Sequence, residues 1–192
     1  MADEAALFDG ESLSSCLGAK LRAVSGVVEN IAQEVFMVTS TEALVTQVVD
    51  QLTMVPLVLH LDQLQTEQSA TRLSRMVDTH DYGMPVRRER MVRGVRLTCV
   101  IPFSGDARLW RLNNGPRSEC QGAVDAERRL LSLTLQNTPD VDERWYRRTI
   151  DATLSEIDRV IQDQTRTLAT FRARVIEAAE QAIARRRRQM QA

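Results

Sequence analysis

Arginine is the residue type whose number and spacing could do chemistry in this sequence. Of the 25 basic residues, Lys20 is the single lysine and all the others are arginines, so lysine-dependent catalysis has little basis here. Guanidinium groups bind phosphates through paired hydrogen bonds. One cluster has five arginines within ten residues, opposed only by Glu89, and it is a candidate for anion or nucleic-acid contact: Arg87, Arg88, Arg90, Arg93 and Arg96.

A second cluster, Arg185–Arg188, lies near the end of the chain. Cations in the last turns of a helix interact favourably with its dipole, so this cluster is better explained by solubility and helix stability than by nucleic-acid contact. Aromatic residues make up 4% of the chain, too few to interleave with either cluster as stacking platforms for bases.

The net charge of -1 hides a division along the chain. Residues 1–86 have 12 acids and 4 bases, a net charge of -8, and residues 87–192 have 14 acids and 21 bases, a net charge of +7. Because the two halves have opposite net charge, they favour contact with each other, either within the fold or between subunits. That contact would occupy arginines that could otherwise bind nucleic acid.

Most enzyme classes lack their motifs in this chain. The sequence has no glycine-rich phosphate loop and no GxGxxG, HExxH, CxxC or GxSxG pattern. His60 and Asp62 would share one face of a strand, but no further ligand follows nearby, although His80 and Asp81 could approach through the fold. We predict no catalytic, cofactor or metal site, and hence a protein that is not an enzyme.

The compartment expected from the sequence is the cytoplasm. The first residues are acidic and precede no long apolar stretch, so no leader is predicted. The most apolar run, 54–59, is far shorter than the roughly 20 residues that span a bilayer, so we expect no membrane partner. Three widely spaced cysteines, Cys16, Cys99 and Cys120, fit free thiols.

Along the chain, the predicted elements that position these residues are first helices, then strands and finally a long helix. Apolar spacing predicts an amphipathic helix from Leu17 to about Met37, and Thr39 stands three residues before Glu42, as in a capping box that begins a second helix ending at Pro56. Residues 55–61 read as a buried strand.

The central region is predicted to be antiparallel sheet. Alternation over 95–101 indicates a strand with one buried face, and 109–112 is interpreted as its continuation. A turn is predicted at 113–116, followed by a hairpin of 120–124 and 129–135 around residues 125–127.

A long helix is predicted after Pro139, because the remaining 53 residues contain neither proline nor glycine. Apolar residues recur at steps of four and three, so this heptad seam predicts packing along another long helix, either the N-terminal one or a second copy of the chain. The single polar member, Gln164, either sets register or marks a break between two helices. The seam consists of Ile150, Leu154, Ile157, Ile161, Gln164, Leu168, Phe171 and Val175.

One segment resembles a module of bacterial multidomain defence-type proteins. In that module a strand ends in an I-P-F-[ST]-G-D turn and precedes a hairpin and a long, arginine-terminated helix. The resemblance covers roughly residues 55–190, and it implies a C-terminal effector, restriction-endonuclease-like or TIR-like, outside this chain. The turn is also explained as structure alone, because proline and glycine set its backbone; its residues are Pro102, Phe103, Gly105 and Asp106.

The expected architecture is α+β: N-terminal helices, a small antiparallel β-sheet and a long C-terminal helix with a heptad seam. Residues 1–140 are predicted to form a globular module, and 141–192 a helix that packs in cis or oligomerises. The expected function is a non-catalytic sensor, scaffold or oligomerisation module, and the resemblance implies that it works in a bacterial antiphage system. Its partner would be a second copy or an effector. The alternative is a nucleic-acid-binding module that uses the first arginine cluster.

Overall fold

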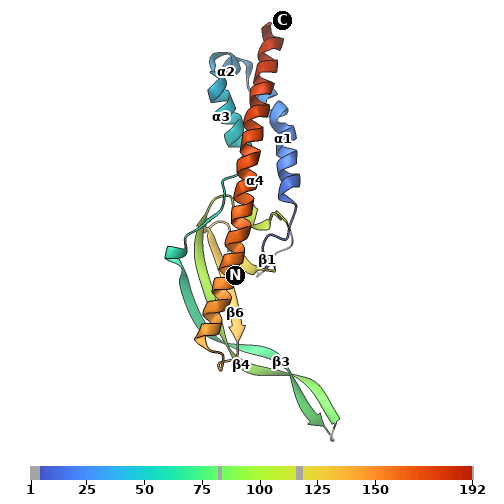
Figure 1. Cartoon of the computed structure of the whole chain (residues 1–192), viewed down its shortest axis with the longest axis vertical. Helices are drawn as coiled ribbons and strands as arrows, with labels where there is room; N and C mark the ends of the chain where they lie inside the picture. The colour runs from blue at the N-terminus through green and yellow to red at the C-terminus, as the bar shows by residue number, and fades with distance from the viewer. Residues whose placement is uncertain (1–4, 82–83, 116–118, 192) are drawn as a thin grey trace. The chain divides into compact units, whose positions relative to one another are not determined.

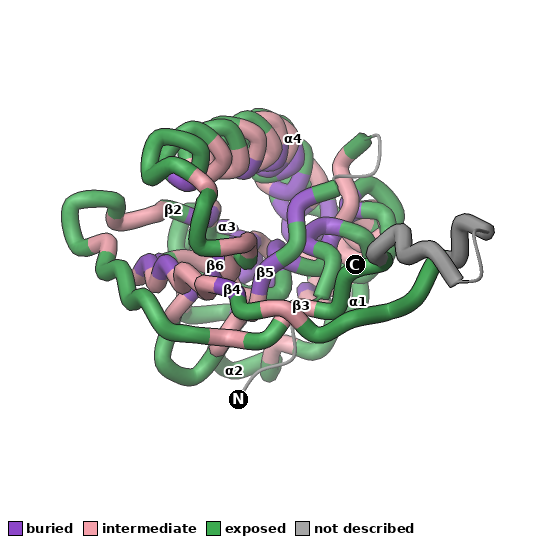
Figure 2. Tube along the Cα trace, turned by 90° about the horizontal axis from the view of Figure 1, so that it is seen from below, coloured by how far each residue is buried: buried purple, intermediate pink, exposed green. Residues whose placement is uncertain are grey.

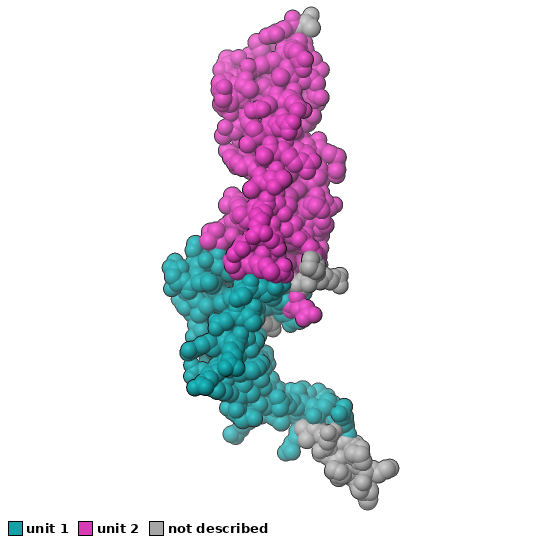
Figure 3. All heavy atoms as spheres, viewed as in Figure 1, with its two compact units in different colours: residues 1–6, 59–103, 120–157 teal, residues 7–58, 104–119, 158–192 magenta. Residues whose placement is uncertain are grey.

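The structure is a computed structural model that describes residues 5–81, 84–115 and 119–191; the side chains of 77–86 are not described. The chain forms two compact units (Figure 3). The first comprises Met1–Ala6, Leu59–Phe103 and Cys120–Ile157, and the second comprises Leu7–Val58, Ser104–Glu119 and Asp158–Ala192. The expected α+β class is confirmed, while the domain boundary expected at 140 stays a prediction.

An antiparallel sheet organises the first unit (Figure 1). Its order is β1-β5-β6-β4, with β3 paired to β4, and the two-residue β2 (Val58–Leu59), where the chain passes between units, also next to β4. The strands are β1 Ala5–Ala6, β3 Gln65–Asp81, β4 Met84–Ser104, β5 Gln121–Asp125 and β6 Leu130–Asn137.

The predicted hairpin is present as β5 and β6. The Asp125 carboxylate accepts hydrogen bonds from the backbone N–H groups of Glu127 and Arg128, at 3.1 and 2.9 Å. Arg129 completes the reversal with a φ of 58°. An Asx turn of this kind satisfies backbone donors that the hairpin loop leaves unpaired.

The sheet has one apolar and one polar face. On β4 the apolar face includes Cys99 and Ile101, both fully buried, opposite Leu133 and Leu131 of β6. Burial raises the pKa of the Cys99 thiol. The alternate residues, such as Thr98 opposite Thr134, are polar and half-buried, as the two-residue period of a strand requires.

The N-terminal segment of the second unit, Leu7–Val58, contains three helices and not the two that the sequence predicted. They are α1 (Leu13–Glu29), α2 (Gln33–Val38) and α3 (Thr41–Leu52). The first predicted helix was wrong in its extent, because α1 ends at Asn30, whose N–H bonds to the Gly26 and Val28 carbonyls. The apolar spacing continues through this break and conceals it.

The cap of α3 also differs from the prediction. Ser40, and not Thr39, is the N-cap, and its hydroxyl accepts a hydrogen bond from the Ala43 N–H at 3.2 Å. The Thr39 hydroxyl instead donates to the Val35 carbonyl oxygen at 2.6 Å and closes the preceding helix.

Two predicted strands are not strands. The segment 55–61 has only β2, and its valines are exposed, with Val55 at 67% and Val58 at 51%. The segment 109–112 lies mostly in a 3-10 helix, η2 (Ala107–Arg111), which buries Leu109 and Trp110. A second short 3-10 helix, η1, spans Leu61–Gln63. Short apolar runs do not distinguish strand from helix.

The predicted long helix is α4 (Glu143–Gln191), 49 residues and about 73 Å long at 1.5 Å per residue. Its seam is buried from Ile157 to Val175, whereas Ile150 and Leu154 are half-buried. Figure 2 shows that α4 has both buried and exposed residues. Beyond Val175 burial continues at Ala179, Ala182 and Ile183. In the second unit Phe171 of this face lines a small cavity together with Leu17 and Leu21 of α1. Whether the seam acts within one chain or between copies stays a prediction. No helix among the described residues is both long and apolar enough to cross a bilayer.

Candidate nucleic-acid interface

The first arginine cluster lies on a two-stranded extension of the sheet. Strand β6 pairs with β4 only from Val95 onward, where Val95 faces Asn137. Beyond that point β4 pairs with β3 alone, up to the pair of Asp81 with Met84. We call residues 71–81 and 84–94 the ribbon (Figure 1). Both of its edges lack a neighbouring strand within the described residues.

Two arginines from β3 join the cluster on the ribbon. All six arginines of the ribbon are exposed, and residues 71–94 contain three acids, so the net charge of this segment is +3. The ribbon arginines are Arg72, Arg75, Arg87, Arg88, Arg90 and Arg93.

The ribbon places arginines directly opposite one another. Arg72 is the cross-strand partner of Arg93, and Arg75 is the partner of Arg90. Side chains of directly opposite residues lie close together, and like charges there destabilise the pairing. Because side chains alternate along a strand, the two pairs lie on opposite faces of the ribbon.

Arg75 is the member of these two pairs that has polar partners within the protein. It donates a hydrogen bond to Asn137 Oδ1 at 3.3 Å. The pKa of Asp140 is lowered mainly by a hydrogen bond with the Thr138 side chain, and the charge of Arg75 contributes as well.

Across the part of the chain that the structure describes, Arg72, Arg90 and Arg93 have no ion pair. The carboxylate of Glu89 accepts a hydrogen bond from the Ser74 hydroxyl. The ribbon is therefore charged and available to an external anion.

Arg96 lies apart from the other members of the predicted cluster. It is half-buried in the three-stranded part of the sheet, between Ser69 and Gln136. Its Nε is buried without a hydrogen-bond partner among the described residues. The sequence cluster therefore does not form one stripe: Arg88, Arg90 and Arg96 alternate in face with Arg87 and Arg93.

The second arginine cluster binds the protein's own backbone. Arg186 donates to the carbonyl oxygens of Val28 and Ile31, the latter at 2.7 Å, and its guanidinium carbon lies 4.2 Å from the Phe36 ring centroid. Arg187 donates to the Thr39 carbonyl oxygen at 3.0 Å. These arginines hold the end of α4 against the loops that flank α2, all within the second unit.

The turn singled out in the sequence has a structural explanation. Gly105 has a φ of 102°, and a Cβ there would overlap the Pro56 carbonyl oxygen. Asp106 begins η2: its carboxylate accepts a hydrogen bond from the Arg108 N–H at 3.0 Å and pairs with the Arg108 guanidinium at 2.5 Å. The side-chain hydrogen bond from Arg108 is the largest effect that lowers the pKa of Asp106. Pro102 is half-buried and Phe103 buried.

Gln164, the polar member of the seam, acts inside the chain. It is 1% exposed, and its amide nitrogen donates to the Leu109 and Leu112 carbonyl oxygens at 3.0 and 2.9 Å. Leu112 is the C-cap of η2, and the Leu109 carbonyl oxygen also accepts a hydrogen bond from the Leu112 N–H at 3.2 Å. Gln164 thus joins α4 to η2, and α4 runs through this position without a break.

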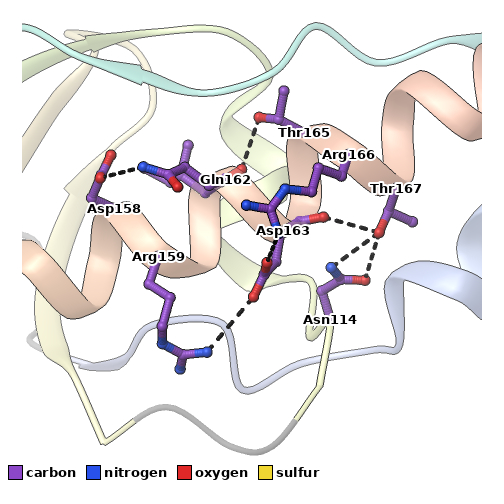
Figure 4. Close-up of polar contacts among 9 residues, drawn as sticks. Asn114, Asp158, Arg159, Gln162, Asp163, Thr165, Arg166 and Thr167 are labelled. Carbon is purple, nitrogen blue, oxygen red and sulfur yellow. Dashed lines mark hydrogen bonds and ion pairs between the residues drawn. The ribbon is translucent and has the colours of Figure 1, made fainter.

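A polar network on α4 secures the loop after η2 (Figure 4). The Asn114 amide nitrogen donates to the Thr167 hydroxyl at 3.2 Å, and that hydroxyl also bonds to the Asp163 backbone carbonyl oxygen at 3.0 Å. The Asp163 carboxylate pairs with Arg159 at 3.6 Å and with Arg166 at 3.2 Å. The carboxylate of this network is therefore paired with arginines of the same helix.

A groove of about 660 Å³ lies in the first unit, beside the start of α4. Two half-buried members of the seam, Ile150 and Leu154, line it together with Val95 and Leu97 of β4. Tyr146 also lines it and is 8% exposed, and its hydroxyl has no hydrogen-bond partner among the described residues. At this end of the seam, half-buried apolar residues therefore lie in an open groove that polar and charged residues, such as Glu143 and Arg147, also line.

The structure brings no metal ligands together in the part of the chain that it describes. His60 precedes η1 and Asp62 lies within it, so the strand on which their shared face depended is wrong. The side chains of His80 and Asp81 lie outside the described residues. Cys16, Cys99 and Cys120 are free thiols.

Sequence reasoning missed Arg72 and Arg75. Neither residue belongs to a dense cluster of arginines in the sequence, so a search for such clusters could not find them. A pairing test would have found them: if 71–94 is folded as one hairpin, arginines recur at equal distances on either side of its tip. No family model matches this chain, and no curated protein or solved structure shows significant similarity to it.

Proposed function

We propose that this chain is a non-catalytic module that binds nucleic acid through the ribbon. The observation that supports this proposal is the pair of opposed arginines on each face of an exposed ribbon, Arg72 with Arg93 and Arg75 with Arg90. A protein that places like charges opposite each other gives up stability. Phosphate groups between the guanidiniums offset that repulsion and form charge-assisted hydrogen bonds.

The test is binding of a labelled oligonucleotide, followed by fluorescence anisotropy at low salt. Replacing Arg72, Arg90 and Arg93 with glutamine should weaken binding at least tenfold, and the slope of log K against log salt should fall by about 2.7 if each arginine contacts one phosphate. The matched control is Arg128→Gln with Arg144→Gln and Arg148→Gln, which removes the same charge from exposed positions elsewhere in the first unit.

Two outcomes contradict this proposal. One is the absence of detectable binding to any nucleic acid at low salt. The other is an equal loss of affinity in the ribbon variant and in the control variant, because general positive charge and not the ribbon would then explain binding.

A second candidate is a sensor or scaffold that acts with a second copy or with an effector, in an antiphage system as the resemblance implies. One specific observation favours it: Ile150 and Leu154 of the seam line an open groove. The remaining seam residues favour a different role, since Leu168 and Phe171 are at most 5% exposed within one chain.

The second candidate is tested by measuring the mass of the protein in solution. If the groove mediates self-association, Leu154→Arg should convert an oligomer into a monomer, whereas Ala152→Arg, at an exposed position on the same helix, should leave the oligomer intact. A native chain that is monomeric at micromolar concentration would argue against self-association, and binding to an effector would then be the remaining form of this candidate.

A further inference from the structure

We infer that the ligand of the ribbon is duplex DNA of the B form, which the ribbon enters through the major groove. This inference rests on the proposed function and specifies the class of nucleic acid. Three features of the ribbon carry it: its width, the distribution of arginines over both faces, and its shortage of aromatic residues.

The width of the ribbon fits one kind of groove. Paired strands lie about 4.8 Å apart, and the major groove of B-form DNA, about 12 Å wide, admits a two-stranded ribbon. The minor groove, about 6 Å wide, is too narrow for a ribbon with long side chains on both faces. The major groove of duplex RNA is deep and narrow and excludes it as well.

Each face of the ribbon carries one opposed pair of arginines, and Glu89 lies on the same face as Arg72 and Arg93. Arg72 and Arg93 project from one face, and Arg75 and Arg90 from the other. The pairs are three residues apart, about 10 Å along the strand. A groove has phosphates on both walls, so both pairs can be neutralised at once. A flat anionic surface, such as a membrane, would meet only one face.

The ribbon lacks the groups that bind single strands. Proteins that bind single-stranded nucleic acid stack bases on aromatic side chains. Within residues 71–94 the only aromatic residue is Tyr82, which lies outside the described residues. Exposed Met76 and Met91, at 63% and 58%, offer apolar contact on the face that also carries Arg72 and Arg93.

The first experiment compares three labelled probes of one sequence by anisotropy: a 24-base-pair DNA duplex, the corresponding RNA duplex and the DNA single strand. We expect the DNA duplex to bind at least tenfold more tightly than either other probe at the same salt. Methyl green, which occupies the major groove, should compete with the protein, and netropsin, which occupies the minor groove, should not.

The second experiment separates the two faces. Arg72→Gln with Arg93→Gln, and Arg75→Gln with Arg90→Gln, should each lower affinity for the DNA duplex by a similar factor of about ten. The slope of log K against log salt concentration should be about -3.6 for four phosphate contacts. In each variant its magnitude should decrease by about half, because two contacts are lost. Arg128→Gln with Arg144→Gln is the control. Circular dichroism verifies that each variant is folded.

The outcomes distinguish this inference from the proposed function. Equal or tighter binding to the RNA duplex or the single strand, competition by netropsin alone, or loss of affinity from one face only would overturn the major-groove inference and leave nucleic-acid binding standing. Failure of every probe to bind at low salt would overturn both.

Discussion

The two arginine clusters of this protein are alike in sequence and opposite in environment. In the second cluster, Arg186 and Arg187 donate to backbone carbonyls and Arg186 lies over the ring of Phe36, inside one compact unit. Arg185 donates to the Ser25 hydroxyl in the same unit. On the ribbon, Arg72 faces Arg93 and Arg75 faces Arg90, on an exposed surface. The denser cluster is the one that the protein uses internally.

This difference shows that charge density alone does not separate structural arginines from binding arginines. What separates them is the set of acceptors within reach. A guanidinium can donate five hydrogen bonds and cannot lose its charge, so an arginine beside unpaired carbonyls is satisfied by the fold. An arginine that lies opposite another arginine finds no such acceptor in its cross-strand partner. The comparison predicts opposite responses to substitution in the two clusters.

The largest expected effect is on stability, in the second cluster. Arg186→Ala removes charge-assisted hydrogen bonds to Val28 and Ile31, and the contact with Phe36. Hydrogen bonds to charged groups contribute about 1.5–3 kcal/mol, so we expect the free energy of unfolding to fall by about 2–3 kcal/mol in urea denaturation. Arg90→Ala is the matched control and should change it by less than about 0.5 kcal/mol. Equal effects would remove the distinction between the clusters.

A smaller effect should isolate the aromatic contact. The guanidinium of Arg186 lies over the Phe36 ring at 4.2 Å, so Phe36→Leu should lose part of the contribution of Arg186 as well as packing. A double-mutant cycle with Arg186→Ala should give a coupling energy of about 1 kcal/mol. A coupling energy near zero would show that the carbonyls alone hold Arg186.

Substitution on the ribbon should change stability in the opposite direction. Arg72→Glu replaces a like-charged pair with an opposite-charged pair across from Arg93, so we expect stability to rise by about 0.5 kcal/mol. Thermal unfolding should show an increase of about 1–2 °C, while affinity for nucleic acid falls. Arg172→Glu, at an exposed position outside the ribbon and without an ion pair among the described residues, controls for the change in net charge. A decrease in stability would indicate that Arg72 has a structural partner.

The smallest effect concerns Arg108, which has a carboxylate partner. Its hydrogen bond lowers the pKa of Asp106. The carboxylate therefore stabilises the fold above its unfolded-state pKa, about 3.9, and this contribution is lost as the pH falls through the lower folded-state pKa. Asp106→Asn should cost less than about 0.5 kcal/mol at pH 7, because Arg108 is 67% exposed. Urea denaturation should give a smaller difference between the two proteins at pH 3 than at pH 7.

The parts of the fold that the sequence predicted are those with an unbroken period. The alternation at Leu131 and Leu133 identified β6, and the heptad spacing around Ile161 identified α4. Periodicity failed as a guide where the apolar spacing continued across the end of a helix. Val28, Ile31 and Val35 keep a helical period across the end of α1, and only the hydrogen bonds of Asn30 reveal the stop.

The ribbon was missed because it has no buried face to generate a pattern. Strand β3 is polar on both sides for most of its length, and its pairing with β4 is a property of the hairpin as a whole. The sequence identified the cluster from Arg87 to Arg96 as a candidate site. The sequence could not show that Arg72 and Arg75 lie on the strand paired with this cluster, because residues that are neighbours across two strands are far apart along the chain.

The open edges of the ribbon have a consequence for how this protein behaves at high concentration. A strand edge with unpaired N–H and C=O groups is a template on which another chain can add a strand. Arginines spaced along such an edge repel an identical edge that approaches it. The charge that prepares the ribbon for an anion therefore also protects it from aggregation, and a variant that replaced all six arginines with apolar residues would be expected to form β-rich assemblies.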